Sequence, residues 1–320
     1  MRSMKAASPE ETVAGGSTHE QKVTITTILL ATDGCADARQ ALLAAADLAK
    51  RSGATLHLVT AYDLPPESLY VFPTGSGLEE MLDTYRGAAL AALDTARSEA
   101  AALGAFVGGI HAERGEVSDV VRSVAESIGA DLVVVGRREL GVVRRLLSGS
   151  VSAAVLHKAR CPVLIVHGPQ PSWPPAQMVI GFDESLAAKR AARLASTIAH
   201  LYPEVTTTLV EVLPDSLVKP NRVLRHSDRV DTEHGRLDRE AKEIDEGAEL
   251  SPATVLAVGH AGDVLVARGG TLPLPNLIVI GSRRLSEVRR LIFGGVSTKI
   301  HHSGHSPLLV VPEAATQRAE

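Results

Sequence analysis

One segment of the sequence occurs twice, and this internal repeat constrains the fold more than any other feature. The first copy reads GRRELGVVRRLLSGSVS from Gly136, and the second reads GSRRLSEVRRLIFGGVS from Gly281. The copies align without a gap and are identical at ten positions. An apolar run precedes each copy, and a second apolar run, led by a proline, follows each. Self-similarity of this extent indicates two units of the same architecture.

Further landmarks divide the chain into these two units. A predicted strand that ends in aspartate opens each half, at residues 28–34 and 178–184. The stretch between the halves is rich in proline and is typical of a stiff linker, whereas the polar N-terminus is typical of disorder. The sequence therefore predicts a disordered tail (1–22), a first domain (23–168), a linker (169–176), a second domain (177–313) and a C-terminal tail (314–320).

Each half alternates short, β-branched apolar runs with longer helical patterns. Strands are expected near 25–31, 54–61, 105–111, 131–136 and 162–167, and again near 178–182, 205–213, 253–259, 276–281 and 307–311. This alternation is typical of βαβ units with a parallel sheet, and right-handed crossovers place helices on both faces. We therefore predict an α/β protein of two tandem, doubly wound domains, each with a five-stranded parallel sheet of Rossmann-like topology.

Composition removes several classes of function. The net charge of −4, from 33 basic and 37 acidic residues, gives no general field that would attract nucleic acid. No apolar run reaches the roughly 18 residues of a membrane-spanning helix, and the N-terminus carries no apolar leader. Cys35 and Cys161 form no metal-binding spacing and favour free thiols in a reducing compartment. A cytoplasmic protein that binds neither membrane nor nucleic acid is expected.

Candidate site residues fall where a doubly wound sheet binds ligands, beyond the carboxyl ends of its strands. Glycine at a strand end lets a ligand approach the backbone, small residues at a helix start offer N–H groups to phosphate, and aspartate can accept from a ribose hydroxyl. Asp33 and Asp183 end the first strand of each half, Gly136 and Gly281 end the fourth, and Gly149-Ser150 and Gly294-Gly295 open the next helix. Together these features indicate a nucleotide site.

This order of features resembles the universal stress protein family over residues 24–168 and 177–313, in the tandem form common in actinobacteria. The family motif G-x2-G-x9-G-[ST] matches at Gly136 and Gly149-Ser150, while Glu139 replaces the second glycine. In the second copy Arg284 replaces the second glycine, and Gly295 replaces the serine or threonine. The resemblance implies the fold of the adenine nucleotide alpha-hydrolases.

The resemblance also implies an adenine-nucleotide ligand, with ATP and Mg²⁺ as the candidates. Carried over residue by residue, the first site comprises Ala31, Thr32, Asp33, Ala61, Gly136, Glu139, Gly149, Ser150, Val151 and Ser152, and the second comprises Asp183, Gly281, Gly294, Gly295, Val296 and Ser297. Glu139 would bring a second negative charge near the triphosphate, at a cost of roughly a few kcal/mol. Arg284 would attract phosphate or block the loop. We therefore expect ATP binding in the first domain to exceed that in the second, where it is weak or absent.

The function implied by the resemblance is that of a non-enzymatic stress-response or signalling protein. No P-loop lysine, second metal-binding carboxylate or added substrate domain favours an enzyme, although weak ATP hydrolysis stays open. The departures at Glu139, Arg284 and Gly295 leave a second alternative open, a dimerisation scaffold with degenerate pockets. In this family the last strand forms edge contacts between domains. We therefore expect residues 163–166 and 308–311 to pair within the chain as a pseudo-dimer, and a homodimer is possible.

Two other groups of residues suggest a reactive thiol and a metal site, but the sequence favours neither. Cys35 follows Asp33-Gly34 near a predicted helix start, where a thiol can become reactive, but a plain small residue is favoured. The histidines at 301, 302 and 305 suggest a metal cluster, yet they align with a helix end in the other copy and lack an acidic or cysteine partner. We expect no metal there.

Overall fold

The computed structural model of the chain describes residues 23–35, 38–64, 76–137, 151–168, 173–214, 226–245, 252–270, 276–282, 295–303 and 306–313. The first half contains β1 (Thr27–Ala31), α1 (Arg39–Ser52), β2 (Thr55–Tyr62), α3 (Ser76–Ala102), β3 (Val107–Arg114), α4 (Val117–Ser127), β4 (Leu132–Arg137), α5 (Val151–Lys158) and β5 (Val163–His167). The second contains β6 (Gln177–Phe182), α6 (Leu186–His200), β7 (Thr206–Leu213), α7 (His226–Asp245), β8 (Ala253–Val258), α8 (Ala261–Gly269), β9 (Asn276–Ser282), α9 (Gly295–Ser303) and β10 (Leu308–Pro312). Every expected strand is present, with its ends within three residues of the prediction.

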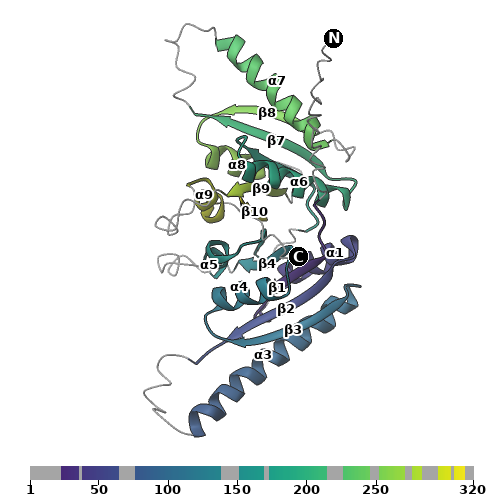
Figure 1. Cartoon of the computed structure of the whole chain (residues 1–320), viewed down its shortest axis with the longest axis vertical. Helices are drawn as coiled ribbons and strands as arrows, with labels where there is room; N and C mark the ends of the chain where they lie inside the picture. Colours follow the sequence, from purple (N-terminus) through teal and green to yellow (C-terminus); the bar gives the residue numbers. More distant parts are fainter. Residues whose placement is uncertain are drawn as a thin grey trace, which may run out of the picture.

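The strands of the described ranges form one sheet in the order β3-β2-β1-β4-β5-β10-β9-β6-β7-β8. Neighbouring strands within each half are parallel, which confirms the predicted fold class. Figure 1 shows the two halves stacked along the long axis of the molecule, with α5 and α9 close together at the junction.

The two halves meet edge to edge through their last strands, as the sequence predicts. β5 and β10 pair antiparallel, with Leu164 opposite Leu309 and Ile165 opposite Leu308. All four side chains are fully buried. Apolar edges that would otherwise be exposed to aggregation therefore cover each other, and the chain forms an internal pseudo-dimer.

Helices cover both faces of the sheet, and the core is aliphatic. One face packs on α1, α3, α6 and α7, and the other packs on α4, α5, α8 and α9. The helix α1 buries five alanines, at positions 41, 44, 45, 46 and 49, so its backbone lies close to the strands. Strands that are buried on both faces read as continuous apolar runs, which is why the sequence reveals them so clearly.

A polar cluster fastens α1 of the first half to the second half. We call Asp47, Arg51, Trp173 and Tyr202 the junction cluster. The Asp47 carboxylate accepts hydrogen bonds from the Tyr202 hydroxyl at 2.7 Å and from Trp173 Nε1 at 3.1 Å. The Arg51 Nε also donates to Asp47, at 3.1 Å, while the guanidinium lies 4.5 Å from the centre of the Tyr202 ring. Burial, together with the Asp47 carboxylate, holds the pKa of Tyr202 well above its usual range.

None of the helices in the described part of the chain is both long enough and apolar enough to cross a membrane.

Candidate functional site

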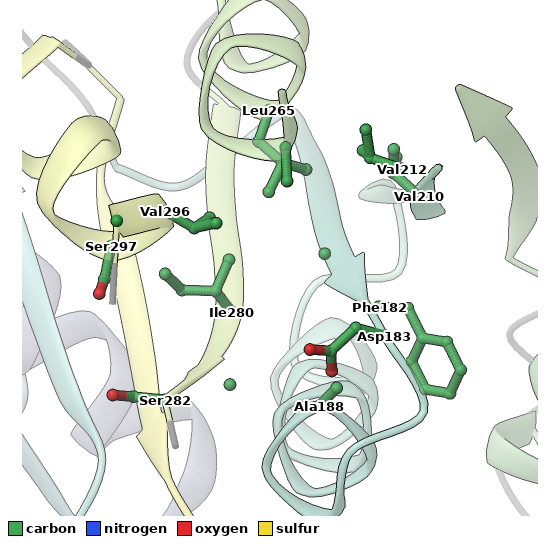
Figure 2. A pocket seen from close by; sticks show the side chains of 14 residues that line it. Phe182, Asp183, Ala188, Val210, Val212, Leu265, Ile280, Ser282, Val296 and Ser297 are labelled. Atoms are coloured by element: carbon green, nitrogen blue, oxygen red, sulfur yellow. The ribbon is translucent and has the colours of Figure 1, made fainter. Parts of the chain in front are cut away.

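A cavity of about 440 Å³ opens in the second half at the carboxyl ends of β6, β7 and β9 (Figure 2). Its volume lies within the range of pockets that bind small molecules and cofactors. The lining comprises Gly181, Phe182, Asp183, Ala188, Val210, Val212, Ala261, Leu265, Ile280, Gly281, Ser282, Gly295, Val296 and Ser297. Five of the six residues proposed from the sequence for this half, all except Gly294, therefore line one cavity.

The topology explains why the cavity forms here. β6 pairs with β7 on one side and with β9 on the other. The chain leaves β6 towards α6 on one face of the sheet and leaves β9 towards α9 on the opposite face. The helices that follow β6 and β9 thus lie on opposite faces, and open α/β sheets bind ligands in the crevice at such a switch point.

Asp183 supplies the charged side chain of the cavity wall. It follows β6 directly, and its Oδ1 accepts from the Ser185 amide at 3.2 Å and from the Ser185 hydroxyl at 2.6 Å. Ser185 in turn caps α6, because its hydroxyl oxygen accepts from the Ala188 amide at 3.2 Å. Figure 2 shows the Asp183 carboxylate directed from the end of β6 towards β9. The turn therefore fixes a carboxylate at the mouth of a mainly apolar crevice.

The walls of the cavity are mainly apolar and suit a flat, weakly polar group. Val210 and Val212 project from β7, Leu265 from α8 and Ile280 from β9 (Figure 2). Strand pairing identifies Val212 as the counterpart of Ala61, since Gly181 pairs with Val210 just as Ala31 pairs with Val59. Asp33 and Asp183 are 150 residues apart, and adding 150 to the number of Ala61 would give Glu211 instead of Val212. The residue spacing alone therefore misses the cavity-lining residue of β7 by one position.

The opposite end of the cavity is formed by the start of α9. Gly295 is its first residue, and Val296 and Ser297 follow within the first turn. The amide groups of a first helical turn have no partner within the helix and carry partial positive charge. This end of the cavity therefore suits an anionic group.

Gly281 lines the cavity and is also constrained by packing, which its position in the sequence does not reveal. We expected a glycine at a strand end to let a ligand approach, but a Cβ at Gly281 would lie 2.4 Å from the carbonyl carbon of Ala187 and 2.4 Å from the nitrogen of Ala188. The close neighbour is thus the backbone of α6. Gly281 shapes the cavity by allowing α6 to lie against β9.

The first half places its corresponding residues at the same edge of its own sheet. Asp33 follows β1, and its Oδ1 accepts from the Cys35 amide at 3.0 Å. The carbonyl of Thr32 accepts from the Thr60 hydroxyl at 2.5 Å, and this hydrogen bond connects the ends of β1 and β2. Ala61 and Gly136 lie near the ends of β2 and β4. The predicted residues Glu139, Gly149 and Ser150, like Gly294 of the second copy, lie outside the described residues.

Val151 and Ser152 open α5, but Ser152 faces the other half of the molecule. Its buried hydroxyl lies 3.1 Å from Nε2 of His301 in α9. Burial lowers the pKa of His301 to about 4, and the nearby charges of Arg137 and His302 contribute. The imidazole is therefore neutral at pH 7 and can share a hydrogen bond with Ser152. Ser152, which the resemblance assigns to the first nucleotide site, thus contacts α9 at the junction between the halves.

No group of three or more histidine, cysteine, aspartate or glutamate side chains that could hold a metal ion occurs among the residues whose placement is described. His301 and His302 lie in the last turn of α9, the helix end that the repeat indicates, whereas His305 falls outside the described ranges. Cys35 is half-buried in the turn that follows β1, and Cys161 is buried.

Comparison with known proteins identifies relatives of both halves. The model of the Universal stress protein family matches residues 24–167 and 176–312. A universal stress protein of Thermus aquaticus is 34% identical over 143 residues, which cover 44% of this chain and 97% of that protein. One of Mycobacterium bovis is 28% identical over 203 residues, covering 58% of this chain and 63% of that protein. The crystal structure of a universal stress protein from Archaeoglobus fulgidus covers 90% of this chain and 98% of its own, with a TM-score of 0.67 at 17% identity.

Proposed function

Because the chain belongs to the universal stress protein family, we propose that it is a non-enzymatic stress-response or signalling protein that binds an adenine nucleotide at the carboxyl edge of its sheet. The observation that carries the proposal is the cavity of the second half, since residues chosen from the sequence as a nucleotide site line a single crevice at a topological switch point. We place the protein in the cytoplasm, as an internal pseudo-dimer of domains at 23–168 and 177–313.

The chemistry of the cavity supports a nucleoside with its phosphates directed towards α9. The adenine would lie against Val210 and Val212, and the Asp183 carboxylate would accept from the ribose hydroxyls. The amides at the start of α9 would face the phosphates. In the first half, Ala61 and Asp33 would take the same roles, and Ser150 would add a hydroxyl donor that Gly295 cannot provide.

This difference makes the two halves unequal for phosphorylated ligands. We propose that the first domain binds ATP, with Mg²⁺ as a possible companion, and that the second binds it weakly. Adenosine, which carries no phosphates, should depend less on the residues that open α5 and α9. Calorimetric titration of the full chain with ATP and with adenosine tests the proposal. Saturable binding is expected, and a chain that takes up neither ligand would contradict it.

Replacing Glu139 with glycine should strengthen ATP binding more than adenosine binding. The family motif has glycine at this position, so backbone amides line the phosphate path, whereas the glutamate adds bulk and negative charge. A repulsion of roughly a few kcal/mol corresponds to about a hundredfold in affinity, and raising the salt concentration should narrow the difference between ATP and adenosine by screening. The measurement is a pair of titrations, with ATP and with adenosine, on the wild-type chain and on Glu139→Gly.

An unchanged or lower ATP affinity would show that Glu139 does not repel the phosphates. Repeating the ATP titration with and without Mg²⁺ would then reveal whether the carboxylate helps to hold a phosphate-bound ion, since Mg²⁺ prefers carboxylate oxygen.

A further inference from the structure

The turn that presents Asp183 has an unusual backbone. Glu184, the next residue, has φ of 61°, and it is the one non-glycine residue with a positive φ in the described part of the chain. Residues with side chains disfavour this left-handed conformation. The equivalent residue of the first half is Gly34, with φ of 73°. Both halves therefore make the same turn after the site aspartate, but the second makes it with a residue that resists it.

A single arginine of α7 contacts the side chain of Glu184. One nitrogen of the Arg236 guanidinium donates to the Glu184 carboxylate. A second nitrogen donates to both oxygens of Glu211, each at 2.6 Å, and Nε donates to Glu233 at 2.9 Å. Charge-assisted hydrogen bonds between a guanidinium and carboxylates are among the strongest that a side chain makes.

Glu211 binds Arg236 on the face of the sheet opposite the cavity. It lies on β7 between Val210 and Val212, which line the cavity, so its side chain points to the opposite face of the sheet. Only 9% of its surface is exposed, and burial raises the pKa of Glu211 while Arg236 opposes the shift. The first half has Thr60 at this position, paired with the Thr32 carbonyl. The second half thus has glutamate at both positions where the first half has Gly34 and Thr60, and Arg236 contacts both glutamates.

We infer that Arg236 is a positioning residue for the nucleotide site of the second half, because it clamps Glu184 in the left-handed turn that directs Asp183 into the cavity. The identity of the ligand in this inference rests on the proposed function, whereas the effect of Arg236 on the turn does not. Arg236 acts from the face of the sheet opposite the cavity, so a displacement of α7 would loosen Asp183 without contact between α7 and the ligand.

The test separates this role from simple support of the fold. Removing Arg236 alone would leave Glu211 buried without a counter-charge, so all variants carry Glu211→Gln, a neutral side chain whose amide oxygen can still accept from Arg236. In that background we compare Arg236→Gln, Glu184→Gly and the combination of the two. Glycine adopts a positive φ without resistance, so it should make the turn independent of the clamp.

Two measurements are made on each full-length variant. The first is hydrogen exchange of the segment 183–188 without nucleotide, where the amides of Ser185 and Ala188 report the turn. The second is adenosine binding by titration, in a chain that also carries Asp33→Ala so that the second site is observed. Arg236→Gln should speed exchange and weaken adenosine binding about tenfold, because the competent turn becomes a minor conformer. Adding Glu184→Gly should restore both the exchange rate and the adenosine affinity to within about twofold of the Glu211→Gln background.

The inference is overturned if Arg236→Gln leaves the exchange of this segment unchanged, or if Glu184→Gly fails to restore it. Failure to restore would mean that Arg236 supports α7 rather than the turn. If the parent chain with Asp33→Ala binds no adenosine, the proposal of a second nucleotide site fails instead, and the exchange results still decide whether Arg236 sets the turn.

Discussion

Gly281→Ala should destabilise the protein by about 2–3 kcal/mol, the upper part of the range for overpacked sites. The added Cβ would lie 2.4 Å from backbone atoms of Ala187 and Ala188. These atoms belong to the start of α6 and its first turn, so they cannot rotate away as the end of a side chain would. The variant therefore has to push α6 away from β9. Urea unfolding followed by circular dichroism measures the loss as a lower midpoint.

Gly295 provides the matched control, because it lines the same cavity but has open space around the position of a Cβ. Gly295→Ala should leave the free energy of unfolding unchanged within about 0.5 kcal/mol, or raise it slightly, since alanine is the better helix former. If Gly281→Ala unfolds at the wild-type midpoint, then α6 does not pack on β9 as described, and the shape of the cavity is wrong.

Asp47→Ala should cost about 2–3 kcal/mol, because hydrogen bonds to a charged group are among the more stabilising ones and buried donors are left without an acceptor. Asp47 accepts from Tyr202, Trp173 and Arg51. Tyr202 is fully buried, so water cannot replace the carboxylate at its hydroxyl. The loss should appear as a lower unfolding midpoint, and Tyr202→Phe, which removes the hydroxyl but keeps the ring, should reproduce part of it.

The control for this prediction is an aspartate in an exposed ion pair. Asp94 lies 2.9 Å from Arg97, and both side chains are more than half exposed. Pairs of this kind contribute little, so Asp94→Ala should change the stability by less than about 0.5 kcal/mol. Equal effects of Asp47→Ala and Asp94→Ala would show that the junction cluster does not hold the halves together.

The sequence was sufficient to predict the architecture because each of its determinants is local or repeated. Strands buried on both faces produce continuous apolar runs, and the duplicated segment from Gly136 and from Gly281 fixes how the two halves correspond. The apolar last strands also predicted their own pairing, since an exposed edge of that kind is a liability. Leu164 opposite Leu309 confirms this expectation.

The candidate site could be predicted only in part, because several of its residues are defined by contacts between distant segments. Val210 and Leu265 carry no motif, and only strand pairing and helix packing bring them to the cavity. The sequence likewise gives no sign that the neighbour of Gly281 is α6, or that Ser152 faces His301 across the junction. Arg236 and Glu211 are 25 residues apart, and their pairing depends on where α7 lies.

The most direct test of the account is a calorimetric ATP titration of the wild-type chain and of the Asp33→Ala, Asp183→Ala and doubly substituted chains. Loss of a carboxylate that accepts from the ribose should weaken a site about 10- to 100-fold. We predict that Asp33→Ala removes most of the ATP binding, that Asp183→Ala leaves most of it, and that the double variant binds ATP at least about tenfold more weakly than the wild-type chain. Wild-type ATP affinity in the double variant would contradict the assignment of these two carboxylates to nucleotide sites.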